Sequence, residues 1–499
     1  MLSISILLFL LVTIDLHAQD AKKRLYDLYQ ETEAFEDSLR DASPDSAFTV
    51  DSIEERNEQY QYWTGVLERI NSIERDSLEL EHQISYDLFK RDVQWEVRDH
   101  EFGAYLVPLN HEGGFHTRIV GTANYANPQT VEEYEEYIAR LRSVNAYFEA
   151  NMKLMRQGLE KGHTLPKKVL SQDYNVMMTS QIYDDATQSD FYGPFESFPS
   201  SISDQQKQRL REEGRAAIEE AIIPAYETFL SFMNKEYRPN ARTSIATKAL
   251  PGGEEYYNFL VNYYTTLEVT PKEVHNVGLD EVKRIRSEME AIIDQVNFEG
   301  SFEEFLNFLR TDPQFYVEEP EQLMKEAAYI AKRMDGKLPE LFNMLPRQPY
   351  GIEPVPDHLA PRYTGGRYSP SSGERDAGYY WVNTYDLKSR PLYTLEALTF
   401  HEAAPGHHLQ IALARELDDL PEIRRQAGVT AFVEGWALYA ERLGLEAGFY
   451  QDPYQQLWSL DLRNVAGLQA GGRYWHACVG LEPRAGCEIY DGKHGAVSP

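Results

Sequence analysis

The sequence predicts a predominantly helical α+β protein, and three observations support this prediction. Apolar residues recur at three- and four-residue spacing along most of the chain, which is the period of an amphipathic helix. Text typical of strands is scarce, and its best example is residues 377–387. Hydrophobic residues make up 42% of the 499 residues, which suffices for a large packed core and argues against wholesale disorder.

Residues 1–18 are predicted to be a signal peptide. Residues 2–14 form an apolar run that is too short to span a bilayer but suits the core of a secretory leader. Cleavage is expected near Ala18, which makes the protein periplasmic or secreted; a short apolar tail is the alternative. No cysteine follows the run, so a lipid anchor is not expected, and no other segment looks like a membrane span.

The charge balance restricts the partners of the protein. The net charge of −31 would repel nucleic acid and anionic membrane surfaces, so neither is expected to be a main partner. Acidity alone does not identify a substrate, and nothing in the sequence determines the oligomeric state.

Residues 19–463 are expected to form one helical body with a soft boundary near residues 238–253. Helical periodicity is clearest in residues 131–162, 270–296, 301–310 and 320–345. Thr270, followed by a proline, is a typical helix start. The segment "AGYYWVNTYDL", residues 377–387, is rich in β-formers and follows a turn-prone stretch, so it is expected to form a strand.

The segment "FHEAAPGHHLQ", residues 400–410, begins like the helix of a zinc peptidase, yet Pro405 occupies the place of the second ligand. In an HExxH helix, the histidines at i and i+4 share one face. Here the histidines that follow His401 are His407 and His408, at i+6 and i+7. An unbroken helix would place them roughly 9 to 10.5 Å further along its axis, and one zinc ion cannot bridge that gap.

Pro405 and Gly406 are expected to break this helix and so restore a metal site. A proline cannot donate to the carbonyl group four residues earlier, and glycine adopts backbone angles that other residues avoid. A two-residue bulge would return the chain to a helix with a histidine near the i+4 position. His401 and His407 are therefore the expected ligands, with His408 as the less favoured alternative. The competing interpretation is a simple Pro-Gly turn with incidental histidines.

Residues 430–444, "TAFVEGWALYAERLG", form a predicted helix that is expected to supply the third ligand. Glu434 and Glu441 are seven residues apart, so their carboxylates lie on one face among apolar neighbours. A buried carboxylate needs a partner, and a metal ion or a ligating histidine is a suitable one. Glu434 is the expected third zinc ligand, and Glu441 is expected to accept a hydrogen bond that orients a ligand. The alternative is a solvated pair of glutamates.

Both motifs resemble those of known zinc peptidases. Glutamate-ligated zinc peptidases of the thimet-oligopeptidase type carry a His-Glu helix ending in Gly-His and a later "FVE" segment, and "PGHH" and "FVEGWALYAE" are similar to these parts. Together with "YYWVNTYDL" and "LEVTPKEVHNVGLDEVKRIRSEME", they resemble the bacterial domain-of-unknown-function 885 family over nearly the whole mature chain. That family is grouped with the glutamate-zincins. The resemblance implies a helical zincin-like fold with a small β-sheet edging the active-site cleft.

The expected function is zinc-dependent hydrolysis of peptide or small amide substrates. Bound zinc activates a water molecule and polarises a carbonyl group, and Glu402 is expected to act as the general base. The segment 377–386 is expected to be an edge strand that binds an extended substrate. The candidate substrate-binding residues are Tyr379, Tyr380, Asn383, Tyr385 and Tyr393. The alternative function is that of a catalytically impaired or metal-free relative that binds peptides without cleaving them.

Residues 464–499 differ in character from the rest of the chain. Helical periodicity ends, glycine becomes frequent, and both cysteines, Cys478 and Cys487, occur here. A one-base forward shift of the reading frame from Arg473 permits "GIGMRVLGWSREQAVRFMMENTALSP", which is helix-like and similar to the continuation of the 885 family. We therefore expect a frame slip that truncates the protein and leaves the zinc ligands in place. A genuine loop-rich tail is the alternative.

Overall fold

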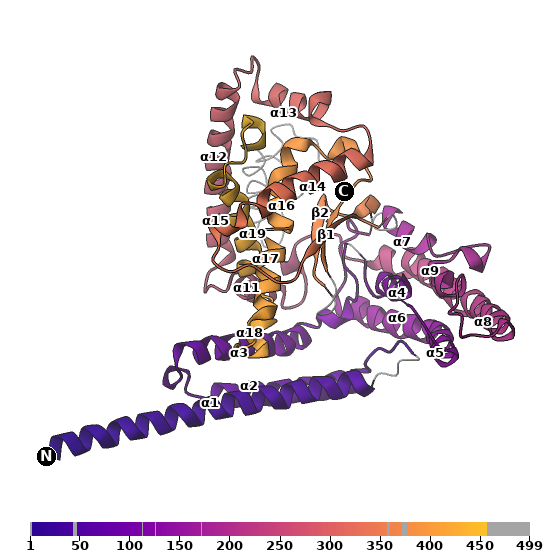
Figure 1. Cartoon of the computed structure of the whole chain (residues 1–499). Helices are drawn as coiled ribbons and strands as arrows, with labels where there is room; N and C mark the ends of the chain where they lie inside the picture. Colours follow the sequence, from indigo (N-terminus) through magenta and orange to yellow (C-terminus); the bar gives the residue numbers. More distant parts are fainter. Residues whose placement is uncertain are drawn as a thin grey trace. The chain divides into compact units, whose positions relative to one another are not determined.

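The computed structural model describes residues 2–42, 47–111, 113–124, 126–170, 172–356, 360–371 and 377–456. These residues form many helices and one small three-stranded sheet, which confirms the predicted fold class (Figure 1). The chain divides into two compact units between Tyr256 and Tyr257. None of the helices in the described ranges is both long and apolar enough to cross a membrane. The predicted tail, residues 464–499, lies outside the described residues.

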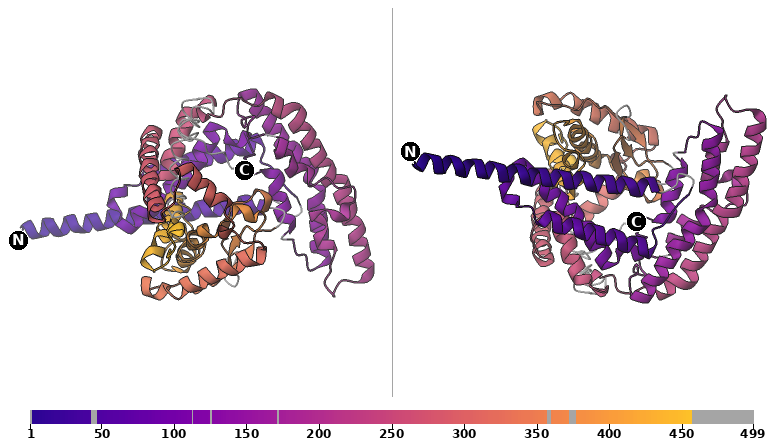
Figure 2. Two further views of the ribbon diagram at one scale, coloured as in Figure 1. Left: turned by 90° about the horizontal axis from the view of Figure 1, so that it is seen from above. Right: turned by 90° about the horizontal axis from the view of Figure 1, so that it is seen from below.

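The first unit consists mainly of helices. They are α1 (Leu2–Ala42), α2 (Ile53–Asn71), α3 (Leu80–Phe102), α4 (Phe115–Asn124), α5 (Val131–Arg142), α6 (Val144–Lys161), α7 (Val176–Thr179), α8 (Asp204–Ala217), α9 (Ile223–Phe232) and α10 (Arg238–Asn240). Helix α11 (Gly253–Thr265) runs across the division. Helix α1 includes the predicted signal peptide and lies along α2 (Figure 2). The rings of Phe35 in α1 and Tyr62 in α2 stack 3.7 Å apart.

The periodic segment 131–162 is two helices that meet at Ser143. The apolar period passes through this break because Ser143 keeps helical backbone angles, φ −76° and ψ −13°. Local pattern alone therefore does not reveal the boundary between the two helices.

The core of the first unit is rich in aromatic rings. Phe115, Phe148 and Phe229 contact one another with ring centroids 4.9 to 5.7 Å apart. The ring of His116 lies 5.1 Å from that of Phe229 and is completely buried. Its two ring nitrogens have no hydrogen-bond partner among the described residues. Burial therefore lowers the pKa of His116 to about 3, because the charged form would lose its hydration.

His116 is expected to make the protein less stable in acid. Its pKa in the folded state, about 3, lies below the ordinary value of 6.5, so the unfolded chain takes up the proton first. Stability is then fully present above pH 6.5 and falls as the pH drops from 6.5 toward 3. Between pH 7.5 and 5.0 this residue alone is expected to remove about 2 kcal/mol from the free energy of unfolding.

The substitution His116→Leu should abolish the loss of unfolding free energy that protonation of His116 causes. Urea denaturation at pH 7.5 and at pH 5.0 measures this loss. His111→Leu, at an exposed position nearby, is the control and should keep the pH dependence of the wild type. An equal loss of stability in His116→Leu and the wild type would show that His116 is not the group responsible.

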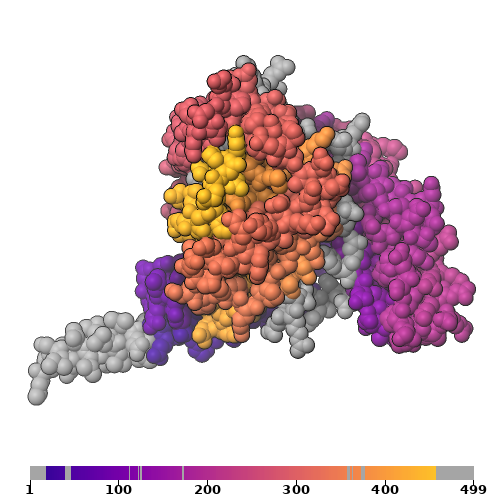
Figure 3. Space-filling model, turned by 45° about the horizontal axis from the view of Figure 1, so that its top comes forward, coloured from indigo at the N-terminus to yellow at the C-terminus, as the bar shows by residue number. Residues whose placement is uncertain are grey.

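The second unit, salmon to yellow in Figure 3, combines helices with the sheet. Its helices are α12 (Pro271–Gln295), α13 (Phe302–Thr311), α14 (Pro320–Asp335), α15 (Leu338–Leu341), α16 (Leu395–Glu402), α17 (His407–Glu416), α18 (Glu422–Arg425) and α19 (Thr430–Glu446). Its strands are β1 (Tyr350–Pro354), β2 (Gly366–Ser369) and β3 (Gly378–Val382). Capping boxes start α12 at Thr270 with Glu273, and α13 at Ser301 with Glu304.

The sheet has the strand order β1-β3-β2, with β1 parallel and β2 antiparallel to β3. Strand β3 is therefore central, and the prediction that it is an edge strand is wrong. Strand β3, GYYWV, has a run of four β-forming residues, whereas β1, YGIEP, and β2, GRYS, have no such run, so neither carries a recognisable strand pattern. One face of the sheet packs against α14 and α16, with Tyr380 and Val382 in the shared core.

Candidate metal centre

The helix that carries the His-Glu pair breaks where proline and glycine predict a break. Helix α16 ends at Glu402 and α17 begins at His407, with a cis peptide bond between Ala404 and Pro405. A Cβ atom at Gly406 would overlap the carbonyl oxygen of His401, so only glycine allows the backbone to approach so closely. The indole N–H of Trp436 donates to the carbonyl of Pro405 at 2.8 Å, which ties α19 to this bend.

The bend brings His401 and His407 together with Glu434 of α19. Nε2 of His401 lies 3.4 Å from Oε2 of Glu434, and Nε2 of His407 lies 3.8 Å from the same oxygen. The two imidazole rings are 4.7 Å apart and almost perpendicular, at 89°. One potential ligand atom from each of the three residues lies within 4.8 Å of the other two. Helix α19 packs directly against α16 and α17, which fixes this arrangement (Figure 1).

These three side chains suit a zinc ion. Ligand atoms in a tetrahedral zinc site lie about 2 Å from the metal and so about 3.4 Å from one another. The two separations from Glu434, 3.4 and 3.8 Å, are close to that value. Two imidazoles and one carboxylate also leave one tetrahedral position open, which is the arrangement of catalytic rather than structural zinc sites.

Glu441 holds His401 from the side opposite Glu434. Oε1 of Glu441 lies 2.8 Å from Nδ1 of His401, and the Glu441 residue is only 2% exposed. Burial by itself would lower the pKa of His401, but the hydrogen bonds to Glu434 and Glu441 outweigh it and raise the pKa to about 10. A carboxylate on Nδ1 leaves Nε2 directed at Glu434, which is how a metal-bound histidine is commonly oriented.

Glu402 lies beside the ligands and is 7% exposed. Its Oε2 accepts the backbone N–H of Tyr368, in strand β2, at 2.7 Å. Burial raises the pKa of Glu402 to about 7, against the opposing positive charge of His401. A carboxylate with a pKa near neutrality can both take up and release a proton at physiological pH.

Residues 33–466 match the profile of the family described as "Bacterial protein of unknown function (DUF885)". The chain belongs to this family. No curated protein sequence matches the chain significantly.

Solved structures share the fold of this DUF885 chain. The "putative lipoprotein" from Colwellia psychrerythraea is 22% identical, with a TM-score of 0.85 over 96% of this chain and 87% of that one. A "putative lipoprotein of unknown function" from Shewanella oneidensis is 18% identical, with a TM-score of 0.64 over 95% of this chain and 86% of that one. At these identities the likeness concerns the fold and not the activity.

His408, the less favoured ligand, points away from the cluster in this DUF885 structure. Its Nδ1 lies 2.9 Å from the hydroxyl of Tyr368, and its ring is 4.7 Å from that of Tyr350. Burial lowers the pKa of His408 to about 4, so the ring is neutral at pH 7. Consecutive residues of a helix point about 100° apart, which separates His408 from the face that carries His407.

Two of the five candidate substrate-binding residues of the DUF885 chain are completely buried. Tyr380 belongs to the core between the sheet and α16. Nδ2 of Asn383 donates to three backbone carbonyls of residues 360–364, and its Oδ1 accepts the N–H of Tyr385. Both side chains thus serve the packing and hydrogen bonding of the fold. Because they are completely buried, a substrate cannot contact them in this conformation.

The other three candidates are at least partly exposed. Tyr385 is 64% exposed, and Tyr379 is half-buried on the outer face of β3. The ring of Tyr393 packs against Phe315 at 5.2 Å, beside the core that α12 and α13 form. Tyr385 is therefore the most accessible tyrosine of this set, and Tyr379 and Tyr393 are accessible in part.

Sequence reasoning did not identify Tyr368, which positions Glu402 through its backbone. No side-chain pattern could have revealed it, because the interaction uses an N–H group that every residue except proline carries.

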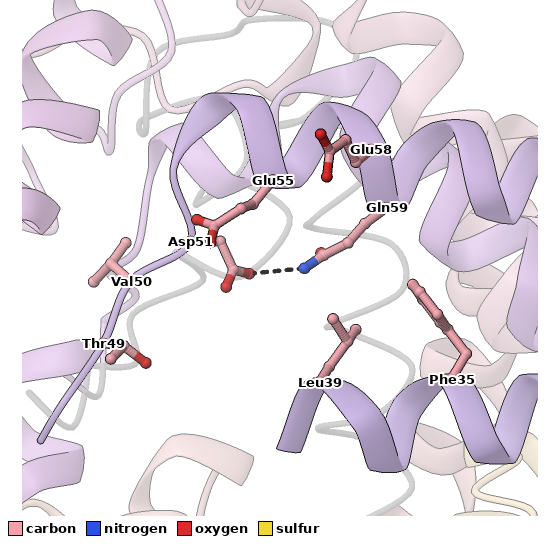
Figure 4. Close-up of a pocket in the computed structure, with 8 residues that line it drawn as sticks. All are labelled: Phe35, Leu39, Thr49, Val50, Asp51, Glu55, Glu58 and Gln59. Atoms are coloured by element: carbon pink, nitrogen blue, oxygen red, sulfur yellow. Dashed lines mark hydrogen bonds between the residues drawn. The ribbon is translucent and has the colours of Figure 1, made fainter. Parts of the chain in front are cut away.

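A pocket of about 360 Å³ in the first unit contains none of the predicted site residues. It lies beside the end of α1 and the start of α2 and is lined by Phe35, Leu39, Thr49, Val50, Asp51, Glu55, Glu58 and Gln59 (Figure 4). Gln59 donates to Asp51 across it at 3.4 Å. The residues that line it include no histidine and none of the side chains of the metal cluster.

Proposed function

We propose that this DUF885 protein is an exported zinc metallopeptidase of the glutamate-zincin type, which hydrolyses peptide or small amide bonds. The observation that carries the proposal is the convergence of His401, His407 and Glu434 beside the buried carboxylate of Glu402. A structural site would more commonly surround its zinc with four protein ligands, whereas this cluster offers three and an acid–base group.

Zinc held by His401, His407 and Glu434 would supply Lewis acidity, activating a water molecule and polarising the scissile carbonyl. Glu402 takes the proton of the attacking water and passes it to the leaving amine. Because the Tyr368 N–H holds Oε2 of Glu402, the carboxylate is kept in one orientation during both transfers. Glu441 keeps the His401 ring oriented through Nδ1.

Export is part of the proposal. The two structurally similar proteins are described as lipoproteins, a class of exported proteins, and the apolar run of residues 2–14 supports a leader cleaved near Ala18. The only cysteines of this chain are Cys478 and Cys487, so we do not propose a lipid anchor.

The second candidate is a metal-free or catalytically impaired protein that binds peptides without cleaving them. The change of character in residues 464–499 motivates it, because a frame slip there would replace the segment with which the 885 family is expected to continue. The two candidates make opposite predictions for peptide cleavage by the purified chain, and the metal-free form of the second candidate also predicts that the chain holds no zinc.

The proposal is tested on the chain without residues 1–18. We expect one zinc per chain by plasma mass spectrometry, and hydrolysis of a mixture of short peptides. His407→Gln and Glu434→Gln should each lower zinc occupancy and hydrolysis at least about tenfold, since each removes a ligand. Glu446→Gln, an exposed glutamate in α19, is the matched control and should behave as the wild type.

A wild-type chain that contains no zinc and cleaves nothing contradicts the metallopeptidase. If that same chain still binds peptides, the second candidate is favoured.

A further inference from the structure

The outer face of the sheet presents an exposed arginine, Arg367, one residue before the N–H group that holds Glu402. Burial alternates along β2, so that Gly366 and Tyr368 are buried while Arg367 between them is exposed. Arg367 pairs with Trp381 of β3 in the antiparallel register, and Trp381 also lies on the outer face. The arginine is therefore displayed on the side of the sheet opposite the core.

An aromatic ring supports the Arg367 guanidinium. Its central carbon lies 5.1 Å from the ring centroid of Tyr363, and that ring lies 6.1 Å from Trp381. Such stacking favours one orientation of the planar group and leaves its N–H groups available to a ligand.

The side chain of Arg367 makes no hydrogen bond or ion pair with any of the described residues. Some arginines of the second unit are paired with carboxylates, as Arg286 is with Glu290 and Arg347 with Glu416. Arg367 differs from these two in that no carboxylate of the described residues neutralises its charge, although the chain has 80 acidic and only 49 basic residues.

The position of Arg367 connects it to the chemistry. The next residue, Tyr368, donates its N–H to Glu402, so Arg367 directly precedes the contact that fixes the general base.

We propose that Arg367 binds a carboxylate of the substrate and thereby directs the enzyme to short peptides with a free C-terminus close to the scissile bond. This inference rests on the proposed function, whose substrate class it specifies. A guanidinium offers two parallel N–H groups that match a carboxylate, which a lysine would not. A protein with a net charge of −31 repels anionic ligands, so recognition of a carboxylate needs a cation placed at the site.

The test compares two mass-labelled mixtures of random tetrapeptides, identical except that one has free C-termini and the other C-terminal amides. The wild type should cleave the free acids with a kcat/KM at least tenfold higher. Arg367→Gln should remove this preference, mainly through a rise of about 10- to 100-fold in KM for the free acids, and Arg367→Lys should restore part of it. A residue with a purely structural role would change the rates for both mixtures alike.

Arg286→Gln is the matched control. Arg286 also stacks on an aromatic ring, that of Phe302 at 3.4 Å, but it is paired with Glu290 in α12. Its substitution removes the same charge from the same unit and should leave the preference for free acids intact.

Retention of the two mixtures on immobilised protein gives a readout that does not require cleavage. Wild-type protein should retain the free acids preferentially, and Arg367→Gln should not. Equal retention and equal cleavage of both forms by the wild type would overturn the role of Arg367 while leaving the hydrolase intact. A wild type that retains free acids but neither holds zinc nor cleaves contradicts the proposed function and supports the carboxylate site alone.

Discussion

The substitution Glu402→Gln is expected to abolish hydrolysis while leaving zinc bound. Glutamine has the shape of glutamate and its carbonyl oxygen can still accept the N–H of Tyr368, so the bend and the ligands should stay in place. It cannot accept the proton of the attacking water. We expect kcat to fall by about 10³-fold, within the range typical of a lost general base. Zinc content, measured on the same preparation as kcat, tests whether the metal stays bound, and kcat tests whether hydrolysis is lost.

Glu396→Gln is the matched control for this experiment. Glu396 is another buried carboxylate of α16, but it accepts the N–H of Tyr450 at 3.0 Å and pairs with Arg333 at 3.4 Å. Its substitution should lower the melting temperature, because a buried charge-assisted contact is lost, and leave kcat per bound zinc nearly unchanged. If Glu402→Gln retained wild-type kcat, another group would have to be the base.

The helices and the bend were predictable because their causes are local. The capping boxes at Thr270 and Ser301 and the apolar period of 3.6 residues act within a few turns of the chain. Pro405 and Gly406 likewise act on their neighbours, through a missing N–H group and a missing Cβ atom. The seven-residue spacing of Glu434 and Glu441 placed both carboxylates on one face of α19, and in the structure both contact His401.

The sheet and the groups around it were not predictable in the same way. Strands β1 and β2 form only because β3 offers a partner, and their pairing joins residues far apart in the sequence. The burial of Tyr380 and Asn383 follows from the helices that cover the sheet, which no pattern within residues 377–387 encodes. The exposed Arg367 is likewise recognisable only once its strand has been placed.

The substitution Gly406→Ala is expected to destroy the metal site by closing the space that the bend requires. The added methyl group would overlap the carbonyl oxygens of Phe400 and His401, which belong to the backbone of α16 and cannot rotate away. Relief requires α16 and α17 to separate, and this displaces His407 from Glu434. We expect a stability loss of about 2 kcal/mol or more, since overpacking against rigid groups commonly costs about 1–3 kcal/mol. Zinc affinity should fall at least about 100-fold, beyond the effect of losing one supporting contact.

Gly435→Ala tests whether any added methyl group near the site has this effect. Gly435 follows the ligand Glu434 in α19, and a Cβ atom there would meet nothing within 4 Å. Because alanine favours a helix over glycine by about 0.5–1 kcal/mol, this control should be slightly more stable and keep its zinc. Zinc titration of both variants measures the change in zinc affinity, and urea denaturation measures the change in stability. If Gly406→Ala bound zinc as tightly as Gly435→Ala, the close approach at Gly406 would not be what brings the two histidines to one ion.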